Sequence, residues 1–356
     1  DTFLKQYPKS TLRPGLDYLK GNCLLNQKNH PEAEKLFRHV MSSAPDTAYA
    51  QQAQYKLAVS LIEHSAIDEA KVELEQLLLV KQPTMLIGDA AFLLGSLKME
   101  TKAYSESVVH FLRVVEQFPQ SEFSTESLYK VGECYALSGE LAKSAETFET
   151  FARTYKAHPL ALEAVFNSAD AYFQLGDYQQ ALVRYQHVVS DAKASAFREE
   201  ALYRVAIAYH NLKNMKEGAE TFANLLKDFP ETKYAAEAHY RIADFQLYES
   251  NTPVEAIEHF KVVANTLPKG PFTGRALKGI AVSHFEMKDF EGAVAMFYRV
   301  ISEYPDLSLR ASTYEWVGEQ LFDAKQWEES SKTFLALLKT IPDFSNTERI
   351  HLKLGE

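Results

Sequence analysis

Apolar residues between Phe118 and Tyr155 follow two successive helical stripes. The first stripe falls at i, i+3, i+4, i+7 and i+8 and consists of Leu128, Val131, Gly132, Tyr135 and Ala136. The second stripe consists of Leu141, Ala145, Phe148 and Phe151. Between them, Ser138-Gly139 supplies a turn in which glycine suits the left-handed cap of the first helix. The pattern therefore predicts a helix, a short turn and a second helix.

This pattern recurs along the whole chain at a fixed interval of 37 residues, the separation of Phe111 and Phe148. One step alone is 38, between Phe222 and Phe260. The large residues in this register are Phe37, Leu74, Phe111, Phe148, Tyr185, Phe222, Phe260, Phe297 and Phe334. Sixteen positions earlier in most repeats stands a small residue, in the series Gly21, Ala58, Gly95, Gly132, Ala169, Ala206, Ala243, Ala281, Gly318 and Gly355. A fixed period of this length indicates a helical repeat protein in which small residues meet large ones.

Most repeats end at a proline, which cannot continue a helix. These prolines are Pro8, Pro45, Pro83, Pro119, Pro230, Pro268, Pro305 and Pro342. The single 38-residue step places its extra residue between Glu249 and Pro253, where Thr252 can cap the next helix and Pro253 can take its first position. A lengthened turn and a specialised contact loop are both open interpretations.

The repeats resemble the tetratricopeptide (TPR) family, which places a small residue, an aromatic residue three later, a small residue twelve later and an aromatic residue sixteen later. Three matching sets are Gly132, Tyr135, Ser144, Phe148; Ala169, Tyr172, Ala181, Tyr185; and Ala206, Tyr209, Gly218, Phe222. The phrase Phe118-Pro119-Gln120-Ser121 is similar to one in bacterial cell-envelope members, such as the TolA-binding and outer-membrane-assembly lipoproteins. The resemblance implies an all-α fold, a right-handed TPR superhelical solenoid of about nine helix-turn-helix repeats.

We expect one continuous array over residues 1–356. Its helix pairs are expected at about 11–43, 48–81, 86–117, 123–155, 160–192, 197–229, 234–267, 272–304 and 309–341, with a fragment of a further repeat at 345–356. Both ends read as parts of further repeats, and a solenoid needs a polar outer face on its last helix. We therefore expect the array to belong to a longer protein.

Composition and motifs exclude several classes of function. The chain has 38 Lys and Arg against 48 Asp and Glu, and the net charge of -10 disfavours nucleic acid as a partner. No apolar stretch approaches the roughly 20 residues of a membrane span. Phosphate loops, paired-His helices and nucleophile elbows are absent from the sequence, and the 11 histidines lack ligand spacing. We expect no enzyme activity, no catalytic residue, no cofactor and no metal.

Cys23 and Cys134 lie three repeats apart. In a regular solenoid this places them tens of ångströms from each other, whereas a disulfide needs Cα atoms within about 7 Å. We expect no bond between them and predict that both are small core residues.

The resemblance implies which positions face the concave groove, because in TPR proteins these lie six and three residues before the small residue and one after it. The groove residues expected here are Asp89, Phe92, Glu126, Tyr129, Glu133, Glu163, Phe166, Asp170, Glu200, Tyr203, Glu237, Tyr240 and Asp244. Further along, Arg275 and Lys278 reverse the charge. Carboxylates interleaved with aromatic rings suit a basic or amphipathic segment of a protein partner. Alternatively, the acids favourably meet helix dipoles and the rings pack between helices.

The favoured hypothesis is a non-enzymatic protein-protein interaction scaffold in a bacterial cell-envelope assembly, located in the periplasm or at the envelope. Two alternatives stay open. The chain is a cytoplasmic regulatory or chaperone-like TPR module, or it is the recruiting arm of a longer enzyme. A charge reversal in the groove and a pull-down would distinguish a binding role of the groove from a structural one.

Overall fold

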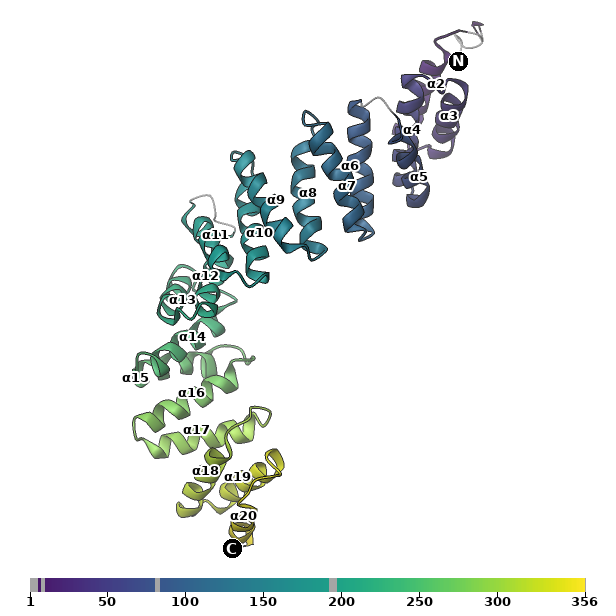
Figure 1. Ribbon diagram of the computed structural model, residues 1–356. Helices are drawn as coiled ribbons and strands as arrows, with labels where there is room; N and C mark the ends of the chain where they lie inside the picture. The colour runs from purple at the N-terminus through teal and green to yellow at the C-terminus, as the bar shows by residue number, and fades with distance from the viewer. Residues whose placement is uncertain (1–5, 8–9, 81–83, 192–196, 356) are drawn as a thin grey trace. The chain divides into compact units, whose positions relative to one another are not determined.

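The computed structural model describes residues 6–7, 10–80, 84–191 and 197–355. Every regular element in these ranges is a helix, which confirms the expected all-α fold (Figure 1). The chain divides into two compact units, Asp1–Arg184 and Tyr185–Glu356. One continuous array over 1–356, with the helix pairs given above, stays a prediction. Pro8 and Pro83 of the proline series lie outside the described residues.

The first unit is built from antiparallel neighbours, because each helix packs against the next one along the chain. Its helices are α2 (Arg13–Asn26), α3 (His30–Ser43), α4 (Ala48–Glu63), α5 (Ile67–Leu77), α6 (Met85–Glu100), α7 (Tyr104–Gln117), α8 (Ser124–Leu137), α9 (Leu141–Thr154) and α10 (Ala161–Gln174). Helix α11 (Tyr178–Ser190) spans the division between the units.

The second unit continues the same local pattern. Its helices are α12 (Arg198–Asn211), α13 (Met215–Asp228), α14 (Ala235–Tyr248), α15 (Pro253–Lys261), α16 (Thr273–Glu286), α17 (Phe290–Glu303), α18 (Ala311–Asp323), α19 (Trp327–Thr340) and α20 (Thr347–Gly355). A π-helical turn, η1 (Val262–Thr266), extends α15.

Small and large residues of the two series pack against each other, as the period predicts. A Cβ atom placed on Gly132 would lie 2.9 Å from the ring of Phe148. Gly318 meets Phe334 in the same way, at 2.5 Å. Glycine thus lets the second helix of a pair approach the first closely enough for the ring to be buried.

The turn inside each helix pair contains one residue in the left-handed backbone region. These residues are Lys28, Ser65, Lys102, Gly139, Gly176, Lys213, Asn251, Lys288 and Lys325, and their spacing follows the repeat. Gly139 has φ of 80°, as expected for a left-handed cap. Only two of the nine are glycine, so the other turns hold a side chain in a conformation that L-residues disfavour.

Exchanging residues at this turn position is expected to change stability in opposite directions. Gly139→Ala should lower the free energy of local unfolding by about 1 kcal/mol, and Lys213→Gly should raise it by about 0.5 kcal/mol. No atom lies within 4 Å of a Cβ on Gly139, so the backbone alone causes the first effect. Hydrogen exchange of α8–α9 and α12–α13 measures both. A loss of stability in Lys213→Gly would contradict the explanation.

The 38-residue step lies where the sequence places it, between α14 and α15, but one detail of the expectation is wrong. Pro253 occupies the first turn of α15 and Thr252 is at the capping position. The Thr252 side chain makes no cap hydrogen bond, because its hydroxyl lies 3.4 Å from the carbonyl oxygen of Gln246, to which it donates. The loop is closed onto the preceding helix rather than onto the helix that follows.

The two cysteines differ from the prediction in one respect. Both are free, and Cys134 is fully buried, so burial raises the pKa of its thiol to about 11. Cys23 is exposed, and its assignment to the core is therefore wrong. Cys134 packs with Val108 and Phe111 of the preceding helix α7. Cys23 has the same place on α2, the first helix in the described part of the chain, where no described helix covers it.

Candidate partner-binding surface

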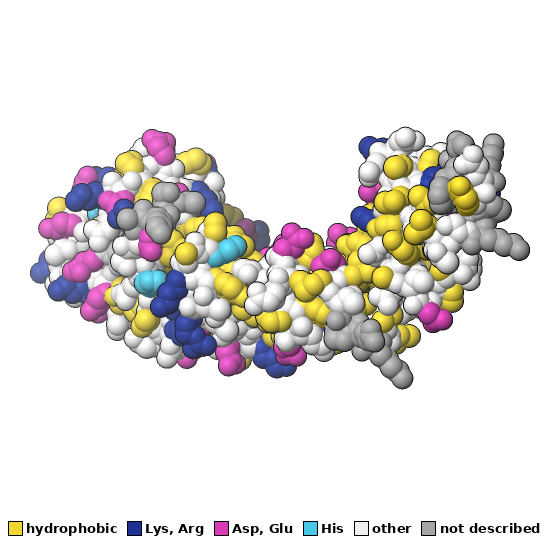
Figure 2. Space-filling view, turned by 90° about the horizontal axis from the view of Figure 1, so that it is seen from above, with side chains coloured by type: hydrophobic (Ala, Val, Ile, Leu, Met, Phe, Trp, Pro, Cys, Tyr) yellow, Lys and Arg dark blue, Asp and Glu magenta, His cyan; other side chains and the backbone are white. Residues whose placement is uncertain are grey.

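The residues expected to face a groove lie on the first helix of consecutive pairs. In the first unit Asp89 and Phe92 are on α6, Glu126, Tyr129 and Glu133 on α8, and Glu163, Phe166 and Asp170 on α10. In the second unit Glu200 and Tyr203 are on α12, and Glu237, Tyr240 and Asp244 on α14. Figure 2 shows one face, on which acidic side chains lie beside hydrophobic ones in the middle of the view.

The aromatic rings of this set pack between adjacent helices. Tyr203 stacks on Tyr234, the residue before α14, with ring centroids 3.9 Å apart, and Phe92 stacks on Phe123 before α8 at 4.4 Å. Tyr129 and Phe166 are only 6% and 8% exposed. The expected ladder of open rings is corrected accordingly, because these two rings stabilise helix packing and offer little surface to a partner.

Hydroxyl groups of the same tyrosines hold one helix pair to the next. The Tyr203 hydroxyl donates to Glu237 Oε2 at 2.9 Å, and Asn167 Nδ2 donates to the Tyr129 hydroxyl at 2.8 Å. Burial raises the pKa of Tyr203, and the Glu237 carboxylate raises it further. Glu237 therefore has a structural role that the sequence pattern did not reveal.

On α8, α12 and α14 a cation follows the first-turn carboxylate four residues later, whereas Asn167 has this place on α10. Lys130 lies 3.7 Å from Glu126, Arg204 lies 3.3 Å from Glu200, and Arg241 lies 3.1 Å from Glu237. The i, i+4 spacing on a helix would have indicated these ion pairs from the sequence. The acidic positions at the first turns are thus partly neutralised, and the surface is less acidic than the carboxylates alone predict.

Two places in the first unit keep an excess of carboxylates. Burial raises the pKa of Asp89, and the nearby Glu122 carboxylate raises it further. Neither acid forms an ion pair with a described cation. On α8, Glu126 and Glu133 share one cation, because Lys130 lies 3.7 Å from the first and 4.0 Å from the second. Burial raises the pKa of Glu133, Lys130 lowers it, and Glu163 and Glu126 raise it. A cation supplied from outside would lower the free energy of the ionised form at both places.

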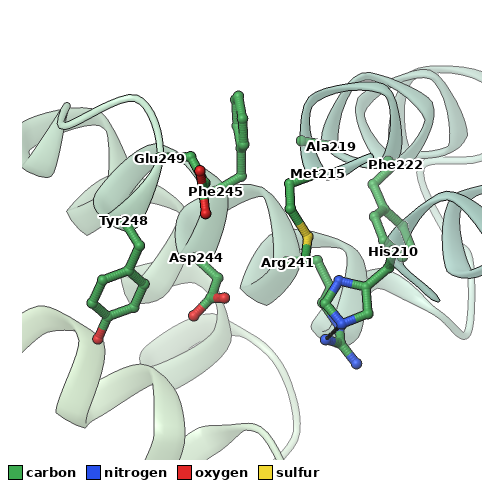
Figure 3. A pocket seen from close by; sticks show the side chains of 10 residues that line it. His210, Met215, Ala219, Phe222, Arg241, Asp244, Phe245, Tyr248 and Glu249 are labelled. Atoms are coloured by element: carbon green, nitrogen blue, oxygen red, sulfur yellow. Dashed lines mark hydrogen bonds between the residues drawn. The ribbon is translucent and has the colours of Figure 1, made fainter. Parts of the chain in front are cut away.

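A small pocket in the second unit lies between α13 and α14 (Figure 3). His210 and Arg241 lie against each other in it, with Arg241 Nη1 2.8 Å from His210 Nε2, and Asp244 and Tyr248 lie further along. Burial lowers the pKa of His210, and the Arg241 guanidinium lowers it further, so the ring is a neutral acceptor. The volume of about 60 Å³ is far below the roughly 300 Å³ of a small-molecule site.

Two histidines of the second unit lie in direct contact, which the sequence did not indicate. His239 Nδ1 and His259 Nδ1 lie 2.8 Å apart, and burial together with the His259 ring lowers the pKa of His239 to about 4. Across the described ranges, no group of three or more His, Cys, Asp or Glu side chains is arranged to hold a metal ion. This pair links α14 to α15, and its contact is structural.

Comparison with known families adds to this geometry. Residues 87–250 match the model of an outer membrane lipoprotein family (YfiO), and residues 276–307 match a tetratricopeptide repeat model. The chain is a tetratricopeptide repeat protein. Its middle repeats are similar to those of the envelope lipoprotein family, as the phrase at Phe118 to Ser121 indicates. This TPR protein gave no match in a comparison with curated proteins.

Solved structures agree on the fold. A structure of Naa15/Naa10 bound to HypK-THB has a TM-score of 0.54 and 14% identity, over 99% of this chain. The TPR chain spans only 56% of the length of that protein. The C-terminal part of a TPR repeat-containing protein from Cytophaga hutchinsonii has a TM-score of 0.53 and 14% identity, covering 74% of this chain and 99% of its own. Among the described helices, none has both the length and the apolar character needed to cross a bilayer.

Proposed function

We propose that this TPR protein is a non-enzymatic scaffold in a bacterial cell-envelope assembly, and that the acids of α6, α8 and α10 bind a basic or amphipathic segment of a protein partner. The match of residues 87–250 to an outer membrane lipoprotein family supports the envelope location. The single observation that carries the binding site is the excess of carboxylates at Asp89, Glu122 and Glu133 in the first unit. In the second unit, Glu200 and Glu237 have the repeat position of Asp89, and Asp244 has that of Glu133.

The contacts decide which acids contribute to binding. Glu237 is already occupied by Arg241 and Tyr203, and Glu200 by Arg204, so their charges are largely compensated within the chain. The Glu122 carboxylate lies near enough to Asp89 to raise its pKa, in addition to burial, so the ionised form of Asp89 is disfavoured. A Lys or Arg of a partner relieves this repulsion, while the apolar side of an amphipathic segment lies on the half-buried stacked rings of Phe92 and Phe123.

Neutralising the three acids that carry the proposed site is expected to weaken partner binding without lowering stability. In the combined variant Asp89→Asn, Glu122→Gln and Glu133→Gln, binding of a Lys-rich amphipathic peptide should weaken about tenfold or more, which is about 1.4 kcal/mol or more. Stability should stay the same or rise. Folding raises the pKa of Asp89 and Glu133, so these carboxyl groups stabilise the fold when protonated at low pH, and this stability is lost as the pH rises through their pKa values. The neutral amides of the variant do not ionise, so the variant does not lose stability in this way.

The matched control is Glu100→Gln, Glu116→Gln and Glu146→Gln, which removes the same charge from three exposed sites of the first unit. Isothermal titration calorimetry and a pull-down from envelope extract measure binding by all three proteins. Equal losses of binding affinity in both variants would show a non-specific charge effect and would contradict the proposed site. Fractionation of cells that carry the protein tests the location, since recovery in the cytoplasm alone would favour the cytoplasmic alternative.

A further inference from the structure

The second unit contains a larger pocket that none of the predicted groove residues lines. Its volume is about 540 Å³, within the range of ligand-binding clefts, which is about 300–1,000 Å³. We call it the aromatic-basic pocket, after Tyr248 on α14, Lys278 and Phe285 on α16, and Arg310 and Trp316 at α18. Apart from Tyr248, these residues lie beyond the stretch that matches the envelope lipoprotein family.

Aromatic side chains at this pocket form an exposed cluster. The rings of Phe285 and Trp316 meet edge to face at 5.3 Å, and Phe290 lies 5.5 Å from Phe285. Tyr248, Phe285 and Phe290 are 58%, 43% and 46% exposed. Contiguous exposed aromatic residues are unusual on a monomer and are enriched at the centres of protein interfaces.

Among the residues that the structure describes, no carboxylate pairs with the cations of the pocket. Within residues 197–355, no carboxylate forms an ion pair with Lys278, Arg310 or the neighbouring Arg275. Arg275 and Lys278 also line an adjoining pocket of about 230 Å³, whose carboxylate, Asp244, interacts with Arg241. In a protein of net charge -10, three adjacent cations left unpaired are complementary to an acidic partner.

Helix dipoles add to this positive potential. The first turns of α12 and α14 carry Glu200 and Glu237, whereas the equivalent positions in α16 and α18 are Arg275 and Ser312, and neither helix has an acid in its first turn. No side chain caps α18, whose first-turn residues line the aromatic-basic pocket. A carboxylate placed there from outside takes the position that Glu237 has in α14.

We propose that the aromatic-basic pocket binds an acidic segment of another protein. One large aromatic or aliphatic side chain of the segment packs against Phe285 and Trp316, and its flanking carboxylates lie at Lys278, Arg310 and the start of α18. This inference goes beyond the proposed function, because it assigns a second site, on other repeats, to a partner of opposite charge.

The test uses the full chain with Trp327→Phe, which leaves Trp316 as the only tryptophan of the chain's two. Its fluorescence is followed while a short, end-blocked peptide with a central Phe flanked by Glu on both sides is added. Matched peptides carry Gln in place of Glu, or Ser in place of Phe. We expect saturable binding of the acidic Phe peptide, at least about tenfold tighter than binding of either matched peptide.

In the same background, Lys278→Gln with Arg310→Gln should weaken binding about tenfold or more. The control Lys227→Gln with Lys339→Gln removes the same charge from exposed lysines of α13 and α19 and should leave binding unchanged. Phe285→Ser, which removes an exposed ring from the pocket, should also weaken it.

Three results would overturn the proposal: equal binding of the acidic and Gln peptides, equal losses in the variant and the control, or self-association of the chain that Phe285→Ser abolishes. The last would assign the pocket to a second copy. Because the proposed function is tested with a basic peptide and with first-unit variants, either proposal can fail while the other holds.

Discussion

Replacing Phe148 by alanine is expected to lower the local free energy of unfolding by about 3–5 kcal/mol, the cost of emptying a filled aromatic site in a core. The ring is 2% exposed and meets Tyr129 edge to face at 5.2 Å. It also belongs to a cluster with Phe151 and with Ala164 of the next helix pair. Removing it therefore leaves a cavity between two pairs, which Gly132 cannot fill.

This loss should be confined to the repeats that the ring joins, because stability in a repeat protein depends on each repeat and its neighbours. Hydrogen exchange followed by mass spectrometry should show faster exchange in α8, α9 and α10 and little change in α2 and α3. Phe148→Leu is the matched control and should cost about 1 kcal/mol, since Leu74 occupies this position in an earlier repeat. An equal loss of protection across the first unit would contradict the local model.

The packing of small against large residues was predictable from the sequence because it depends on covalent spacing. A period of 37 residues places Gly132 and Phe148 on two helices of one pair at every recurrence, and the contact follows from helix geometry. The position of the left-handed turn follows in the same way. That lysine stands at this turn position, as in Lys213 and Lys288, was not predictable. A left-handed backbone is strained for lysine and persists only because the surrounding helices hold it, which a local sequence pattern does not reveal.

The candidate groove stays a prediction, and the structure shows what the sequence could not say about its acids. Glu126, Glu200 and Glu237 lie in the first turns of α8, α12 and α14, yet whether each carboxylate is available depends on which neighbouring side chains reach it. Tyr203 reaches Glu237 across 34 residues of sequence, a contact that exists only after two helix pairs have packed. The burial of Tyr129 has the same origin.

The aromatic-basic pocket was not predictable, although its charge was. Arg275 and Lys278 interrupt the acidic series in the sequence, whereas Trp316 and Phe285 occupy positions outside the expected groove register. They meet because α16 and α18 are first helices of adjacent pairs, and Leu309 and Arg310 of the segment before α18 line the pocket with them. The periodic pattern of the helices does not predict a pocket that is lined in part by a connecting segment.

Arg241→Met is expected to lower the free energy of unfolding of the middle of the second unit by about 2–3 kcal/mol, because it removes the cation from a largely buried network. The guanidinium contacts Glu237 at 3.1 Å and His210 at 2.8 Å, and Tyr203 donates to the same carboxylate. The Arg241 and Glu237 side chains are 26% and 18% exposed. Without the cation, Glu237 keeps its charge, and among the described residues only the Tyr203 hydroxyl still donates to it.

A double-variant cycle shows whether the uncompensated carboxylate causes this loss. Arg241→Met combined with Glu237→Gln should cost less than the sum of the two single changes, because the neutral amide no longer needs the cation. Arg299→Met on α17 breaks the exposed pair with Glu303 and should cost at most about 0.5 kcal/mol. Hydrogen exchange of α12 and α14 measures the cycle.

In Arg241→Met the pKa of His210 should also rise, because a neighbouring positive charge has gone, and nuclear magnetic resonance of the ring follows this pKa. Strict additivity with an unchanged His210 pKa would show that the contacts are not coupled, and Glu237 would then count again among the acids open to a partner.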